Sequence, residues 1–128
     1  DLVLDLSTTH YVDHWITPVG EKRRFDTRFF VTEAPAGQEG LHDDKETTDS
    51  LWVSPQKALE MHEAGELLMM PPTVYNLGRL AQSATAADAV AAGEALTDVA
   101  CILPKLRSID GGKISIALPG DADYDTLK

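Results

Sequence analysis

The stretch HWITPVGEKRRFDTRFFV, His14 to Val31, gives the clearest indication of how this chain folds. Apolar and polar residues alternate over 24–32, which is the period of a β-strand with one face turned to a core. A second extended segment, 11–17, ends at Pro18, and turn residues follow over 18–22. The stretch therefore predicts a β-hairpin whose second strand packs one alternating set inward: Phe25, Thr27, Phe29 and Val31.

The second strand of this hairpin carries arginines in a chain of formal net charge −10. Arg24 and Arg28 project from one strand face, with Asp26 between them. These side chains can form a ladder of cross-strand salt bridges. They can equally form a ligand face, because guanidinium groups match phosphate oxygens in a bidentate fashion. The residues alone leave both interpretations open.

The size and composition of the chain limit its function. Its 128 residues suffice for one domain, or for the larger part of one. The acidic excess argues against a nucleic acid polymer or an anionic membrane as partner, because both require a basic surface. No apolar run approaches the roughly 20 residues that cross a bilayer. Cys101 is the only cysteine, so no disulfide can form within the chain, and we expect a reducing, cytoplasmic setting. Because Cys101 lies in an apolar segment, we expect its thiol to be buried and inert.

Helical and extended patterns alternate over the remainder of the chain. A short strand is expected over 50–53, followed by a helix with Ser54 at its N-cap and Pro55 at its first position. A second helix is expected from about Pro72, and Thr85 caps an alanine-rich third helix. Two strands around a turn at 110–112 complete the pattern. The mixture predicts an α/β or α+β fold with a C-terminal β-hairpin.

The acidic segment before the first helix is a candidate cation site. Asp43, Asp44, Glu46 and Asp49 lie close together in the sequence, and carboxylate oxygens are the ligands that hard cations prefer. The alternative is a solvated loop. His10 and His14 have the spacing of a metal pair on a helix, but in a strand they would lie about 13 Å apart. We therefore expect an ordinary structural role for both histidines.

Four segments, in order, resemble one family of enzymes. They are W-x-T-P and R-F-D-T-x-F-F within 15–30, then W-V-S-P-Q-K-A-L from Trp52, then M-M-P-P-T from Met69. Together they look like the second half of a Nudix hydrolase, and most like bacterial relatives of the peroxisomal acyl-CoA diphosphatases. The resemblance implies an α/β/α sandwich with a mixed sheet. It also implies Mg²⁺- or Mn²⁺-dependent cleavage of a small diphosphate-containing substrate, either a coenzyme A derivative or a nucleoside diphosphate derivative.

The catalytic Nudix box of that family, G-x5-E-x7-R-E-U-x-E-E-x-G-U with U a bulky aliphatic residue, does not occur in these residues. If Gly65 is taken as its second glycine, Ala58 and Leu59 fall where Arg-Glu is required. In the family the box lies upstream of W-x-T-P, so we expect a longer protein and no diphosphatase activity from these residues alone. The resemblance suggests Glu46 as a catalytic and metal-binding carboxylate outside the box, with Asp44 as a second metal ligand.

The predicted substrate contacts lie on the hairpin: Arg24, Arg28, Asp26 and Trp15. We expect a single, partial Nudix-like domain over 1–128. Its core sheet and flanking helices would occupy 1–82, and a helix with a hairpin would occupy 83–128. The alternative function is a non-catalytic binding or dimerisation module derived from a Nudix domain. In that case the alanine-rich helix and the C-terminal hairpin would form the interface of a homodimer.

Overall fold

The computed structural model describes residues 6–37, 40, 44, 45, 49–109 and 113–128. It combines helices with a mixed sheet and an antiparallel hairpin, which confirms the predicted α+β class. The chain forms two compact units that interleave along the sequence. The first consists of Asp1–His10 and Val31–Glu94, and the second of Tyr11–Phe30 and Ala95–Lys128. The predicted division at 82/83 stays a prediction.

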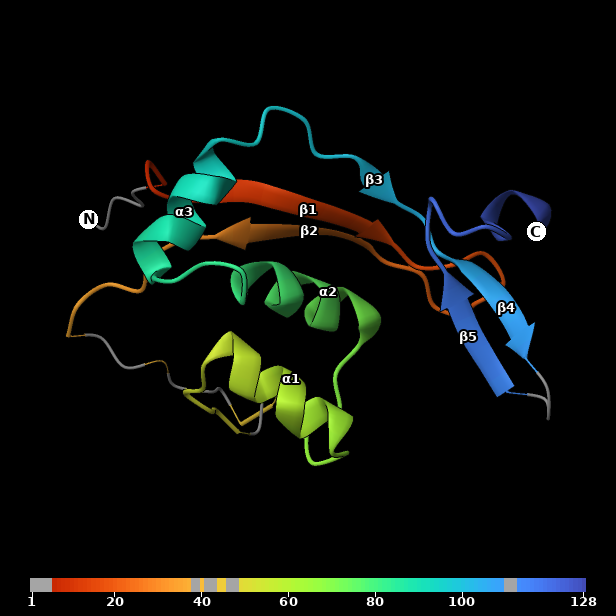
Figure 1. Cartoon of the computed structure of the whole chain (residues 1–128), viewed down its shortest axis with the longest axis horizontal. Helices are drawn as coiled ribbons and strands as arrows, with labels where there is room; N and C mark the ends of the chain where they lie inside the picture. Colours follow the sequence, from red (N-terminus) through yellow and green to blue (C-terminus); the bar gives the residue numbers. More distant parts are fainter. Residues whose placement is uncertain (1–5, 38–39, 41–43, 46–48, 110–112) are drawn as a thin grey trace. The chain divides into compact units, whose positions relative to one another are not determined.

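The first unit holds the three α-helices, α1 (Pro55–Glu63), α2 (Pro71–Leu80) and α3 (Ala86–Glu94). Ser54 caps α1 by accepting a hydrogen bond from the backbone N–H of Lys57 at 3.3 Å. Thr85 caps α3 reciprocally, because its Oγ1 accepts from the N–H of Asp88 while the Asp88 carboxylate accepts from the N–H of Thr85. Helices α1 and α2 pack against each other (Figure 1). All three helices lie where the sequence predicts them.

The second unit contains most of a mixed three-stranded sheet, in the order β2-β1-β3. Its strands are β1 (His10–Ile16), β2 (Asp26–Val31) and β3 (Cys101–Ile102). Strands β1 and β2 run in opposite directions as the predicted hairpin (Figure 1), whereas β3 pairs with β1 in parallel. In that pairing His14 lies opposite Cys101 and Trp15 opposite Ile102.

The C-terminal hairpin is also present, with β4 (Lys105–Ile109) paired antiparallel to β5 (Lys113–Ala117). Its predicted turn, 110–112, lies outside the described residues. Hydrogen bonds connect the segment after β5 to β4, and this segment includes a 3₁₀ turn, η1 (Tyr124–Thr126). The guanidinium of Arg107 donates to both Asp121 and Asp123, at 2.9 and 2.6 Å. Lys105 Nζ donates to the carbonyls of Tyr124 and Leu127, each at 2.9 Å.

The pKa of Asp123 lies below its ordinary value, chiefly because its carboxylate accepts a hydrogen bond from Arg107. The same hydrogen bond is the main reason that the pKa of Arg107 is raised. The carboxylate is stabilised in its charged form by this partner, and the guanidinium likewise. We call this arrangement of Arg107 with Asp121 and Asp123 the C-terminal clasp.

Two sequence predictions about local structure are wrong. Residues 50–53 form no strand in the structure, and the N–H of Ser50 donates instead to the side chain of Asp49 at 2.8 Å. Such a local bond competes with strand pairing. Cys101 is exposed rather than buried, because β3 is a two-residue strand at the edge of the sheet.

The alternation in β2 is confirmed only in part. Phe29 and Val31 are half-buried as predicted. Thr27 is exposed, and Phe25 precedes the first residue of the strand and is 62% exposed, so the prediction that these two residues face the core is wrong.

Candidate functional site

The hairpin of β1 and β2 fixes the position of Arg24. The backbone N–H of Thr17 donates to the carbonyl of Phe25 at 3.0 Å, and the N–H of Phe25 donates to Thr17 Oγ1 at 3.0 Å. Across this closed end Arg24 Nε donates to the carbonyl of Thr17, also at 3.0 Å. One of the five N–H groups of the guanidinium is thereby used to orient the side chain.

Asp26 is the shared acceptor of two basic side chains. His14 Nε2 lies 2.6 Å from Asp26 Oδ1, and Arg28 Nη1 lies 3.3 Å from the same oxygen. The two donors differ in exposure, since the His14 side chain is 15% exposed and that of Arg28 is 55% exposed. The pair between Asp26 and Arg28 is therefore a solvent-accessible contact that a competing anion can reach.

Trp15 occupies an interior position on β1. Only 3% of it is exposed, and its indole Nε1 donates to the carboxylate of Asp13, which is itself 3% exposed. The backbone N–H of His14 donates to the other Asp13 oxygen at 3.1 Å. The indole is thus part of a buried polar contact and does not face the solvent in the described structure.

The predicted metal ligands are described only in part. Glu46 and Asp43 lie outside the described residues. Asp44 is an exposed residue with a positive φ of 58°, a backbone conformation in which aspartate is enriched among non-glycine residues. Within the described parts of the chain, no three His, Cys, Asp or Glu side chains gather as a cation site. The described residues therefore do not by themselves make a complete metal centre.

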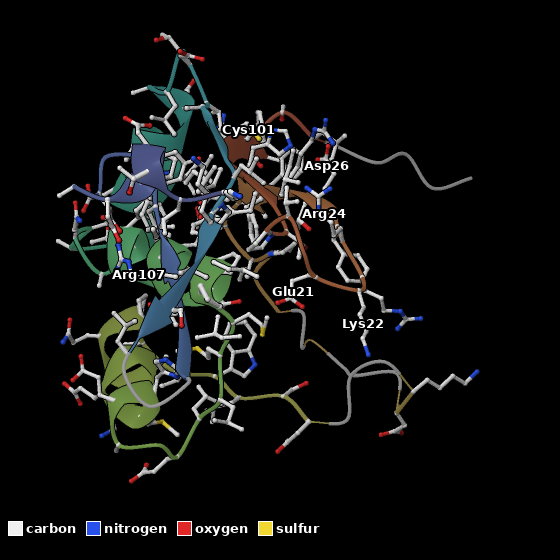
Figure 2. All side chains as sticks on the ribbon, turned by 90° about the vertical axis from the view of Figure 1, so that its right-hand side faces the viewer. Glu21, Lys22, Arg24, Asp26, Cys101 and Arg107 are labelled. Atoms are coloured by element: carbon white, nitrogen blue, oxygen red, sulfur yellow. The ribbon has the colours of Figure 1, made fainter. Side chains whose placement is uncertain are left out.

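Of the residues predicted on the hairpin, the structure brings Asp26 and Arg28 into direct contact. Arg24 and Asp26 lie near each other on the hairpin, while Arg107 on β4 lies well apart from them (Figure 2). Asp44 belongs to the other compact unit. Sequence reasoning did not connect His14 with this group. The sequence places His14 on the strand opposite Asp26, but only the alignment of β1 with β2 shows that these two residues meet.

Comparison with known proteins connects this hairpin to a family. The family profile described as the NUDT19 Nudix domain matches residues 1–80, which include the hairpin, α1 and α2. The chain belongs to that family. The predicted relationship to Nudix hydrolases and to acyl-CoA diphosphatases is thereby confirmed.

Three curated relatives of this Nudix chain carry the name acyl-coenzyme A diphosphatase NUDT19. The protein named acyl-coenzyme A diphosphatase NUDT19 from Homo sapiens is 32% identical over 128 residues, which cover 97% of this chain and 34% of the human protein. The Gallus gallus protein of that name is 32% identical over 121 residues, covering 87% of this chain and 31% of its own length. The Xenopus laevis one is 41% identical over 71 residues, covering 52% and 19%.

This Nudix chain spans about a third of the length of the human relative. No solved structure matches it. Among the described residues, no helix is long and apolar enough to cross a membrane.

Proposed function

We propose that this chain forms the substrate-contacting part of a hydrolase that cleaves the diphosphate of a coenzyme A derivative or a nucleoside diphosphate derivative. Its membership of the NUDT19 Nudix domain family and the names of its relatives support diphosphate hydrolysis. The observation that carries the assignment of residues is the exposed pair Asp26–Arg28 beside the oriented Arg24. Both guanidinium groups retain N–H donors of the geometry that phosphate oxygens accept.

The hairpin residues have separate roles in this proposal. Among the described residues, the only hydrogen-bond partner of Arg24 is the carbonyl of Thr17, which Nε contacts. The two terminal nitrogens of Arg24 can therefore bind one phosphate group. Arg28 would exchange its 3.3 Å contact with Asp26 for a second phosphate oxygen. Asp26 keeps Arg28 close to the site until the substrate arrives, and His14 holds Asp26 in place. Trp15 contributes by fixing β1 through Asp13.

The family generally uses divalent metals, and we propose that Asp44 and Glu46 each supply a carboxylate ligand to Mg²⁺ or Mn²⁺. Such a cation neutralises diphosphate charge and activates water. The principal ligands would belong to the Nudix box, which these 128 residues lack. We accordingly expect substrate binding by this chain, without turnover. The lone Cys101, which has no disulfide partner within the chain, supports a reducing, cytoplasmic compartment.

Calorimetric titration with coenzyme A tests the assignment of the arginines. We expect Arg24→Gln and Arg28→Gln each to weaken binding by about tenfold or more, because a hydrogen bond between charged groups contributes about 1.5–3 kcal/mol. Arg23→Gln is the matched control, since Arg23 is exposed, adjacent in sequence and causes the same change of net charge. Equal weakening by all three changes would indicate unspecific attraction and would contradict the proposal.

Incubation of the chain with an acyl-coenzyme A and Mg²⁺ or Mn²⁺ tests the expected lack of turnover. Formation of two phosphomonoester products by these 128 residues would overturn the claim that hydrolysis requires the box.

A second candidate function is a binding or dimerisation module without catalysis. The first unit exposes large apolar side chains, a feature of surfaces that contact other proteins: Leu51 at 59%, Trp52 at 76%, Leu68 at 91% and Met70 at 72%. Light scattering discriminates this candidate, because a strictly monomeric solution state at high concentration would remove the homodimer.

A further inference from the structure

The first unit contains a cavity of about 420 Å³ where the starts of two helices meet. The beginning of α1 and the beginning of α3 form its walls, together with the end of α2 and the segment that leaves β2. More than half of its lining residues are apolar, among them Val31, Pro55, Leu80, Ala84, Ala86 and Ala89. Its volume falls within the range of about 300–1,000 Å³ that is typical of small-molecule pockets.

The described lining of this cavity is apolar in character and carries no charged side chain. Its polar side chains are uncharged and belong to Thr32, Ser54, Gln56, Ser83 and Thr85, of which Ser54 and Thr85 are engaged in helix caps. Ser54 Oγ accepts from the N–H of Lys57 at 3.3 Å. Thr85 Oγ1 accepts from the N–H of Asp88 at 3.1 Å and donates to the Asp88 carboxylate at 2.7 Å. An ionic ligand would find no side-chain counter-charge among these residues, whereas an aliphatic ligand would lose little solvation on entry.

Alanines keep the space open. Ala84, Ala86 and Ala89 each present a single methyl group where a longer side chain would fill the cavity. Charged residues make up 25% of this chain, yet none of the described residues that line this cavity is charged. This lining favours an uncharged ligand with an aliphatic part over a phosphate.

We propose that this cavity binds the aliphatic chain of an acyl-coenzyme A. The inference rests on the proposed function, because the diphosphatase relatives named for acyl-coenzyme A supply the reason to expect a hydrocarbon next to a diphosphate. It adds a subsite in the first unit that recognises the acyl group, separate in chemistry from the arginines that recognise phosphate.

The experiment measures binding to the whole chain by calorimetry with two kinds of probe. S-acyl-pantetheines from two to ten acyl carbons carry the hydrocarbon but no diphosphate, and free coenzyme A carries the diphosphate but no acyl group. In the parent chain we expect the affinity for acyl-pantetheines to rise about two- to fourfold for each added methylene until the cavity is full.

Ala86→Trp fills the cavity from the first turn of α3, and Ala87→Trp is its matched control. Both alanines are exposed on the same helix, but only Ala86 lines the cavity. We expect Ala86→Trp to abolish the dependence on acyl length and Ala87→Trp to preserve it. Ala84→Trp, which lies before α3 and also lines the cavity, provides a second filling variant if the first fails to fold.

The two proposals fail in different ways. An affinity for acyl-pantetheines that is independent of length in the parent chain would overturn the acyl subsite, as would equal behaviour of the filling and control variants. A parent chain that binds acyl-pantetheines with the expected dependence but does not bind coenzyme A would sustain the apolar subsite and overturn the proposed diphosphate function.

Discussion

Replacement of Trp15 by phenylalanine tests whether the indole acts on the fold or on a ligand. The change keeps an aromatic ring in a position that is 3% exposed, but it removes the N–H that donates to Asp13. Asp13 is equally buried, so water cannot readily replace the lost donor. A hydrogen bond to a charged group contributes about 1.5–3 kcal/mol. The backbone N–H of His14 still donates to Asp13, and we therefore expect a loss of about 2 kcal/mol in the free energy of unfolding, within that range.

Urea unfolding followed by far-ultraviolet circular dichroism measures this difference. Trp52→Phe is the control, because Trp52 is the other tryptophan of the chain and is 76% exposed. We expect the control to change stability by less than about 0.5 kcal/mol. The reasoning is refuted if Trp15→Phe leaves stability within that margin while coenzyme A binding falls tenfold, since the indole would then contact the ligand directly.

Three further predictions concern the caps, the clasp and a turn. Thr85→Val should lower the stability of the folded chain by about 1 kcal/mol, because α3 loses the hydroxyl that accepts from Asp88; thermal unfolding against the parent measures this. Asp123 has a lowered pKa, so its contribution to stability is present above its ordinary value of 3.8 and is lost as the pH falls through the folded-state value. Asp123→Asn should therefore unfold with a weaker pH dependence below about pH 4, and an unchanged acid profile would argue against the clasp with Arg107. Gly20→Ala should cost about 1 kcal/mol in urea unfolding, because Gly20 has a φ of 103° that an L-residue adopts only with strain.

The helix starts could be predicted because they depend on contacts within a few residues. Ser54 with Pro55 gives α1 its beginning, and Thr85 with Asp88 gives α3 its beginning. Both arrangements are encoded in a four-residue window, so no knowledge of distant parts of the chain is needed. The alternation around Phe29 was readable for the same reason.

Features that depend on distant residues could not be predicted. Residues 50–53 have the composition of a strand, yet a strand requires a neighbour, and Ser50 bonds locally to Asp49. Cys101 lies in an apolar segment, but its exposure follows from the edge position of β3, which only the sheet order shows. The contact between His14 and Asp26 likewise depends on how β1 and β2 align.

The salt-bridge and ligand-face interpretations of the hairpin arginines are compatible in this structure. Asp26 Oδ1 is 2.6 Å from the half-buried His14 and 3.3 Å from the exposed Arg28, so His14 is its nearer and better shielded partner. An exposed ion pair such as Asp26–Arg28 contributes only about 0–1 kcal/mol, because water and salt screen it. A phosphate that forms a bidentate bond with Arg28 gains more than the side chain loses on leaving Asp26. The weak pair holds Arg28 near the hairpin surface, but Arg28 can still leave Asp26 to contact another anion. In the proposed function, this arrangement would let an acidic chain keep a small site for an anion, because the carboxylate that contacts Arg28 is also held by His14.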